Sequence, residues 1–102
     1  DTADSQMAKI ELAVQNAFLI GMARQEQGDH VGAEPAFRKA LELQRAIHGE
    51  PSAPVAQYMS NLVTNLYRQG RKSEAADLQN EALDMLRELG ATGSVAPMNR
   101  PV

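Results

Sequence analysis

Two glycines 42 positions apart, Gly28 and Gly70, lie in matching sequence, and this duplication constrains the fold more than any other feature. The surrounding residues recur in the same order: Gln27-Gly28, Ala33, Ala40-Leu41 and Arg45 match Gln69-Gly70, Ala75, Ala82-Leu83 and Arg87. Self-similarity at a fixed period of this length is typical of repeat architectures, in which each unit buries its apolar face against a neighbouring unit. The sequence therefore predicts two similar units that pack on one another and leave an extended face for another protein or peptide.

The composition is that of one small helical domain without a strongly charged surface. The chain has 102 residues, no Cys, no Trp and a net charge of −3, from 13 acidic and 10 basic residues. Because the two signs are interspersed, no basic stripe attracts phosphate groups, and we expect no nucleic-acid partner. No uninterrupted apolar run approaches the ~20 residues of a membrane-spanning helix, so we expect a soluble protein with no membrane partner.

The cellular compartment stays open at the level of sequence. Absence of cysteine excludes disulfides and thiolate metal sites, but it is compatible with every redox compartment. The first residue is Asp1 rather than Met, which we interpret as processing or excision. The location therefore stays open between the cytoplasm and, if Asp1 is a processed N-terminus, the periplasm.

Helix-breaking residues divide the chain into four predicted helices that form two hairpins. Apolar residues at three- and four-residue spacing predict helices from Asp4 or Ser5 to Gln27, from Asp29 to about Ile47, from Pro54 to Gln69, and from just after Gly70 to Leu89. Gly28 and Gly70 are expected to end the first helix of each hairpin. Segment 91–102 is predicted to be a flexible tail or linker because it holds glycine and proline and few apolar residues.

Pro35 restricts the start of the second predicted helix. Proline has no amide hydrogen to donate to the carbonyl of Val31, so regular helical hydrogen bonding is interrupted at this position. We therefore expect the first turn to begin near Val31 or Gly32, or the helix to bend.

Small residues at matching positions predict close helix crossings in both hairpins. They are Gly21, Ala33 and Ala40 in the first hairpin, and Ala75 and Ala82 in the second. Small side chains at a crossing let two helix backbones approach, and larger neighbours then fill the remaining space. Among these larger neighbours we expect burial, at about 1.5–3 kcal/mol each, of Ile20, Leu41, Leu62 and Leu83.

These features together resemble the tetratricopeptide repeats, specifically the 42-residue type found in kinesin light chains. Segment 32–41 looks like the Glu-Ala-Glu-Pro-Leu…Arg-Ala-Leu pattern of that type, and segment 48–56 is similar to its Leu-Gly-x-x-His-Pro-Asp-Val-Ala loop. Asn61-Leu62 and Leu66-Tyr67 are similar to its Asn-Leu…Leu-Tyr helix. The similarity covers about residues 14–89, with departures at Arg24 and Gln79, where the family prefers a large apolar or aromatic residue.

The resemblance implies an all-α superhelix, a solenoid of two helical hairpins and four helices. It places repeat one at about 14–52 and repeat two at about 56–90, with residues 4–13 as an N-terminal extension of the first helix. The first helix of each repeat is then expected to line a concave face that binds a partner. Its register in repeat two is open by one residue, because Leu66 and Tyr67 both fit the aromatic position before Gly70.

By the register of the family, ten side chains are expected to bind the partner: Gln15, Phe18, Met22, Gln25, Gln57, Ser60, Asn61, Thr64, Tyr67 and Arg68. Phe18 and Met22 lie one helical turn apart, a spacing that suits a pocket for an apolar side chain. Alternatively, they pack on the start of the first helix, on a neighbouring subunit or on a further repeat. Asn61 and Asn65 are candidates for hydrogen bonds to a peptide backbone, with simple solvation as the alternative.

The implied function is a non-enzymatic protein–protein interaction module or scaffold that needs no cofactor and no metal. His30 and His48 have no second His or Cys at metal-ligand spacing, and no phosphate-binding loop or nucleophile elbow is present. The alternative is a structural, self-assembling or regulatory repeat segment of a larger multidomain protein. In that case a second copy or neighbouring repeats would cover the ends of the array.

Overall fold

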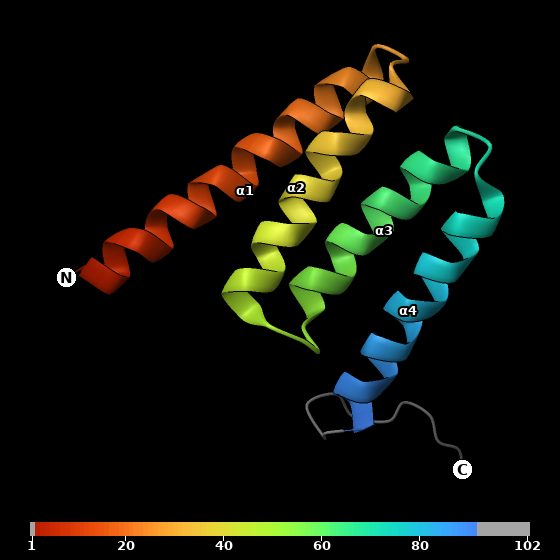
Figure 1. The fold of residues 1–102 in the computed structure, drawn as a ribbon. Helices are drawn as coiled ribbons and strands as arrows, with labels where there is room; N and C mark the ends of the chain where they lie inside the picture. The colour runs from red at the N-terminus through yellow and green to blue at the C-terminus, as the bar shows by residue number, and fades with distance from the viewer. Residues whose placement is uncertain (1, 92–102) are drawn as a thin grey trace.

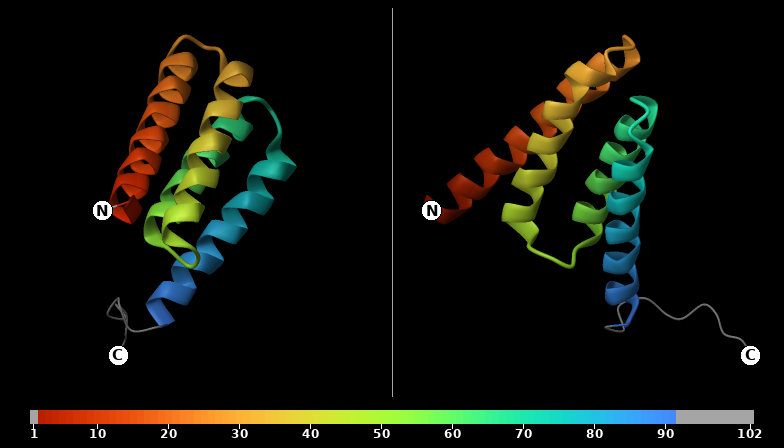
Figure 2. Two further views of the ribbon diagram at one scale, coloured as in Figure 1. Left: turned by 60° about the vertical axis from the view of Figure 1, so that its left-hand side comes forward. Right: turned by 45° about the vertical axis from the view of Figure 1, so that its right-hand side comes forward.

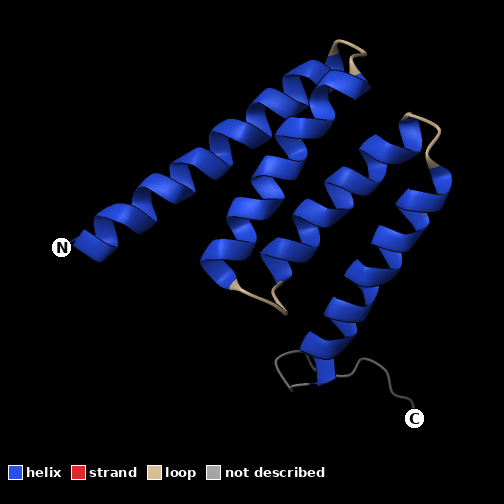
Figure 3. Ribbon diagram, viewed as in Figure 1, coloured by secondary structure: helices blue, strands red, loops and turns tan. Residues whose placement is uncertain are grey.

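The protein, described for residues 2–91 in a computed structural model, is a row of four antiparallel helices joined by short turns (Figure 1, Figure 3). The helices are α1 (Thr2–Glu26), α2 (His30–His48), α3 (Ala53–Arg68) and α4 (Lys72–Ala91). No strand occurs in this part of the chain, so the all-α prediction is confirmed. Of the predicted tail 91–102, Ala91 is the last residue of α4, and residues 92–102 lie outside the described residues.

The turns of both hairpins have the glycine stops predicted from the sequence. Gly28 and Gly70 adopt φ angles of 85° and 83°, a left-handed conformation that favours glycine because it has no Cβ. Asp29 caps α2 by accepting a 2.9 Å hydrogen bond from the amide of Gly32, and Ser52 caps α3 by accepting one of 3.3 Å from Val55. These caps fix where each following helix begins.

Asp29 starts α2 as predicted, by capping it, whereas the start expected from Pro35 is late by one or two residues. The helix begins at His30 rather than at Val31 or Gly32, and Pro35 lies inside it. The Asp29 cap stabilises the first turn directly, so the helix tolerates the loss of the one hydrogen bond that Pro35 cannot donate.

Each helix packs against the next along the chain, and the small residues lie at the contacts. Gly21, Ala33, Ala40, Ala75 and Ala82 are all buried, which confirms the predicted close crossings. At Gly21 an added Cβ would lie 2.8 Å from Cε1 of Phe37, closer than two carbon atoms pack. The absence of a side chain there is what allows α1 to approach α2. Toward its N-terminus α1 extends away from α2, in agreement with the exposure of residues 2–9 (Figure 2).

Two of the four predicted core residues are not in the core. Leu41 and Leu62 are buried as expected, but Ile20 is 48% exposed and Leu83 is 41% exposed. Both lie on the outer helices α1 and α4, which contact a neighbouring helix of the described chain on one side only. The one-residue ambiguity between Leu66 and Tyr67 is also resolved: Leu66, 1% exposed, faces the core, and Tyr67, 60% exposed, faces outward.

Candidate functional site

Two adjoining pockets lie where α1, α2 and α3 meet, near the loop that joins α2 to α3. The first has a volume of about 260 Å³ and is lined by Glu11, Val14, Gln15, Gln44, His48 and Tyr58. The second has a volume of about 240 Å³ and is lined by Phe18, Gln44, Pro54, Gln57, Tyr58 and Asn61. Gln44 and Tyr58 belong to both, so the pockets form one surface, which we call the α1–α3 groove.

Aromatic rings form the apolar wall of the second pocket. The Phe18 ring contacts the Tyr58 ring edge-on, with centroids 5.4 Å apart, and it lies 6.0 Å from the ring of buried Phe37. Such tilted and edge-to-face pairs are favourable geometries for aromatic side chains. Because Phe37 is fixed in the core, this wall is held in place before any partner binds.

Amide side chains provide most of the polar groups of the groove. Gln15 and Gln57 are exposed, Asn61 is half-buried, and Gln44 is 9% exposed at the junction of the two pockets. Within residues 2–91 the Gln44 amide has no hydrogen-bond partner. Its amide nitrogen and oxygen are not fully enclosed, so in the free chain they are open to solvent that enters the pockets.

The first pocket is the more polar of the two, and its lining includes a carboxylate. Glu11 contributes that carboxylate from α1, and His48, the last residue of α2, lies in the same lining. Neither Lys nor Arg lines either pocket within the described part of the chain. The described lining therefore offers no lysine or arginine side chain to pair with an acidic ligand.

Four of the ten predicted binding residues line the α1–α3 groove: Gln15, Phe18, Gln57 and Asn61. Met22 lies half-buried against the core cluster. The Gln25 side chain accepts a hydrogen bond from Asn65, so one of its polar atoms is already used within the protein. These two residues lie nearer the hairpin turns than the groove does.

The other four predicted residues line neither pocket of the groove, although all four are exposed. The hydroxyls of Ser60 and Thr64 donate to the carbonyls of Ala56 and Ser60, one helical turn earlier. Tyr67 lies beneath Lys72, whose Nζ is 5.9 Å from the ring centroid. Arg68 is exposed at the last position of α3. The ten residues are thus spread along the α1 and α3 helices rather than gathered at one point.

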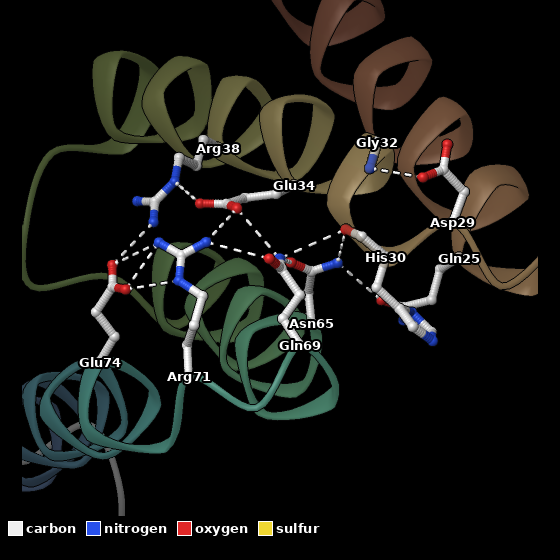
Figure 4. A network of polar contacts seen from close by, with 10 residues as sticks. All are labelled: Gln25, Asp29, His30, Gly32, Glu34, Arg38, Asn65, Gln69, Arg71 and Glu74. Atoms are coloured by element: carbon white, nitrogen blue, oxygen red, sulfur yellow. Dashed lines mark hydrogen bonds and ion pairs between the residues drawn. The ribbon is translucent and has the colours of Figure 1, made fainter.

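Asn65 is a structural residue rather than a free peptide-binding amide. It is fully buried, and its amide nitrogen donates to the carbonyl of His30 at 2.9 Å and to the Gln25 side chain at 3.1 Å. Its side-chain oxygen accepts a 2.7 Å hydrogen bond from Gln69 (Figure 4). Asn65 therefore ties the second hairpin to the first turn.

An ion-pair network continues this connection between the hairpin turns (Figure 4). The Glu34 carboxylate accepts hydrogen bonds from Arg38, Gln69 and Arg71, and Glu74 contacts both arginines. Partial burial is the largest single influence on the pKa of Glu34 and raises it, but the three hydrogen bonds together outweigh burial and hold that pKa below its ordinary value of 4.5. The network stabilises the ionised form of Glu34.

Sequence reasoning missed six residues of the groove: Glu11, Val14, Gln44, His48, Pro54 and Tyr58. For Gln44 a signal was present, because it is a polar residue on the apolar stripe of the second predicted helix. Tyr58 carries no such signal, since its contact with Phe18 depends on how the two hairpins pack.

Outside the groove, the described residues form a further pocket but no metal site. Among residues 2–91 no three His, Cys, Asp or Glu side chains are placed to hold a metal ion. A third pocket, of about 250 Å³, lies on α4 and the α2–α3 loop, where Glu50 and Glu81 are paired with Arg45. The helices of the described chain are too short or too polar to span a bilayer.

Comparison with known proteins identifies the family. No curated protein and no solved structure matches the chain significantly. A sequence model of the tetratricopeptide repeat family, whose members generally mediate protein–protein interactions without catalysis, matches residues 10–88. That match spans both hairpins, and the buried glycine and alanine positions agree with it. The chain belongs to the tetratricopeptide repeat family.

Proposed function

We propose that this chain is a non-enzymatic interaction module that holds a segment of a partner protein, or a peptide, in the α1–α3 groove. The observation that carries the proposal is the pair of adjoining pockets formed by the first helix of each repeat over the floor of α2. Each pocket is smaller than the roughly 300–1,000 Å³ of small-molecule sites, so it suits a single side chain of a peptide rather than a cofactor.

The side chains that line the groove suit peptide binding. Phe18 and Tyr58 supply rigid aromatic surface next to hydrogen-bonding amides, a combination typical of the residues that contribute most to interface affinity. Since Phe18 is held by Phe37, little conformational entropy is lost on binding. Absence of Lys and Arg from the described lining favours a protein partner over nucleic acid or an anionic membrane.

The finer family assignment is also a proposal. The period of 42 residues and the likeness of segments 32–41 and 48–56 favour the type found in kinesin light chains. On that interpretation the binding face continues along α3 past the groove to four exposed residues, Ser60, Thr64, Tyr67 and Arg68. A longer peptide would reach them, together with Met22 and Gln25 on α1.

A selection experiment tests the groove. A phage-displayed library of random seven-residue peptides is panned against the chain, and recovered peptides are measured by fluorescence anisotropy. The variant Gln57→Arg/Asn61→Arg fills the mouth of the second pocket without altering a fully buried position, and it is expected to lose about tenfold or more in affinity.

The matched control makes the same kind of change on α4. Gln79→Arg/Asn80→Arg replaces two exposed amides far from the groove and is expected to bind like the parent chain. The proposal fails if no peptide is recovered, or if the groove variant and the control bind the recovered peptides equally.

A second candidate function, stacking with other repeats or with a second copy, is favoured by one observation. Six of the eight exposed large apolar side chains of the described chain lie on the two outer helices: Met7, Leu12, Leu19 and Ile20 on α1, and Leu83 and Leu86 on α4. A protein that stays monomeric by light scattering over a wide concentration range would exclude self-association. A shift to monomer on Leu83→Lys/Leu86→Lys would support it and place the contact on α4.

A further inference from the structure

Gln44 combines burial, an unpaired amide and a position between two pockets. It is 9% exposed, has no hydrogen-bond partner within residues 2–91, and lines both halves of the α1–α3 groove. Its amide atoms are not fully enclosed, so they are open to solvent in the free chain and can exchange water for a ligand group. The repeat does not need an amide here, since the position 42 residues later is occupied by Leu86. The amide is therefore available to a partner from outside the chain.

The amide of glutamine suits one particular partner. It offers a carbonyl acceptor and an NH₂ donor side by side, which is the complement of the C=O and N–H of a peptide main chain. A main-chain unit crossing Gln44 would place its neighbouring side chains at the two pockets. In an extended peptide, side chains two positions apart point to the same face, so the pockets would receive residues i and i+2.

The two pockets differ in the side chain that they suit. The first contains the Glu11 carboxylate, which makes no ion pair within the described residues, together with the amide of Gln15 and the C-terminal end of α2 at His48. A helix C-terminus carries partial negative charge and favours a cation. The second contains Phe18, Tyr58 and Pro54 and no charged side chain among the described residues.

We propose that the groove binds an extended peptide with Lys or Arg two positions from an apolar or aromatic residue, and that Gln44 bonds the main chain between them. The basic side chain occupies the first pocket beside Glu11, and the apolar one occupies the second pocket against Phe18 and Tyr58. This inference rests on the proposed function and adds the chemical class of the partner.

Selection with a charge-reversed groove tests the class of peptide. The phage library of random seven-residue peptides is panned in parallel on the parent chain, on Glu11→Lys and on the control Glu26→Lys, an exposed residue of the same helix that lines neither pocket. The parent chain and the control are expected to select a basic residue two positions from an apolar one. Glu11→Lys is expected to select Asp or Glu at the basic position.

The outcomes separate this inference from the function on which it rests. Recovery of groove-dependent peptides without a basic preference, or with a preference that Glu11→Lys leaves unchanged, overturns the inference while groove binding stands. If every recovered peptide binds the Gln57→Arg/Asn61→Arg variant as tightly as the parent chain, or if none is recovered, both the inference and the proposed function are overturned.

The role of Gln44 is tested by Gln44→Leu, which introduces the residue found one period later. We expect affinity for the selected peptide to fall about tenfold, with an unchanged melting temperature because the amide makes no hydrogen bond within the described chain. Gln79→Leu, on the exposed side of α4, is the control and is expected to leave affinity unchanged. Undiminished affinity in Gln44→Leu would show that the amide does not bond the peptide. A lowered melting temperature that accounts for weaker binding would show that the amide has a structural role only.

Discussion

The two hairpins carry similar residues at equivalent positions, yet these positions are buried to different extents. Leu41 of α2 is 5% exposed, whereas Leu83, its equivalent on α4, is 41% exposed. Phe37 is 1% exposed, and exposed Gln79 takes its place in the second hairpin. The difference arises because α3 packs against α2, while no described helix packs on the outer side of α4. Burial in a repeat protein thus depends on the next unit in the stack as well as on the residue.

The contact between helices within each hairpin is also built differently. In the first hairpin Gly21 leaves room for the ring of Phe37, whereas in the second the equivalent positions hold Val63 and Gln79. The second hairpin therefore has a side chain where the first has none, and no ring that needs the space. By contrast, the alanines at the centre of α2 and α4, Ala40 and Ala82, are buried in both hairpins.

The substitutions with the largest expected effect on stability lie at equivalent positions of the two hairpins. Ala40→Glu and Ala82→Glu each place a carboxylate in a fully packed crossing, at a cost of several kcal/mol against a total stability of about 5–15 kcal/mol. We expect both variants to lose the helical circular dichroism signal at room temperature. Ala76→Glu, at an exposed position of α4, should fold normally. A parent-like melt of Ala82→Glu would mean that the second hairpin does not rely on a close crossing.

A matched pair of leucines measures the difference between the hairpins directly. Leu41→Ala should lower the free energy of unfolding by about 2–5 kcal/mol, because it removes buried surface and leaves a cavity. Leu83→Ala should lower it by about 1 kcal/mol or less, since its side chain is already partly in water. Urea denaturation monitored by circular dichroism gives both values. Equal losses would show that Leu83 is covered in solution, by a second copy or another part of the chain.

Local features made most of the fold predictable from the sequence. The helix count, the turns at Gly28 and Gly70, the Asp29 cap and the small residues at the crossings depend on neighbouring residues and on helical periodicity. Periodicity marks an apolar stripe but does not indicate whether another helix covers it, which is why Ile20 and Leu83 were predicted to be buried.

The groove was predictable only in part for a related reason. The register of the first helix in each repeat placed Gln15, Phe18, Gln57 and Asn61, which do line it. Gln44 lies on the second helix of a repeat, a position that the register does not assign to the binding face. Asn65 was a candidate for peptide binding, with solvation as the alternative, because an exposed and a buried amide look alike in sequence. Only the packing of α3 against the first turn distinguishes them.

The close approach of α1 and α2 at Gly21 provides a further test of the difference between the two hairpins. In Gly21→Ala the new methyl group would clash with the Phe37 ring, and we expect a loss of about 1–2 kcal/mol after the gain in helix propensity is included. Gly90→Ala, in α4 with no described neighbour within 4 Å of the new Cβ, should instead gain about 0.5–1 kcal/mol. Urea titrations compare the two. A Gly21→Ala variant more stable than the parent would show that the ring moves aside without cost.

The smallest expected effect concerns Glu34, which connects the hairpins, whereas its equivalent on α4 is exposed Ala76. Because hydrogen bonds hold the pKa of Glu34 in the folded chain below 4.5, the unfolded chain binds more protons on acidification. The stabilisation from Glu34 is therefore fully present above about pH 4.5 and is lost as the pH falls through the folded-state pKa.

Glu34→Gln should lower the free energy of unfolding by roughly 0.5–1 kcal/mol at pH 7 and by less at pH 3, as measured by urea denaturation at both pH values. The control Glu42→Gln, an exposed carboxylate of α2 with no ion pair in the described chain, should show no such pH-dependent difference. A Glu34→Gln penalty that is the same at both pH values would mean that the ionised carboxylate does not stabilise the contact between the hairpins.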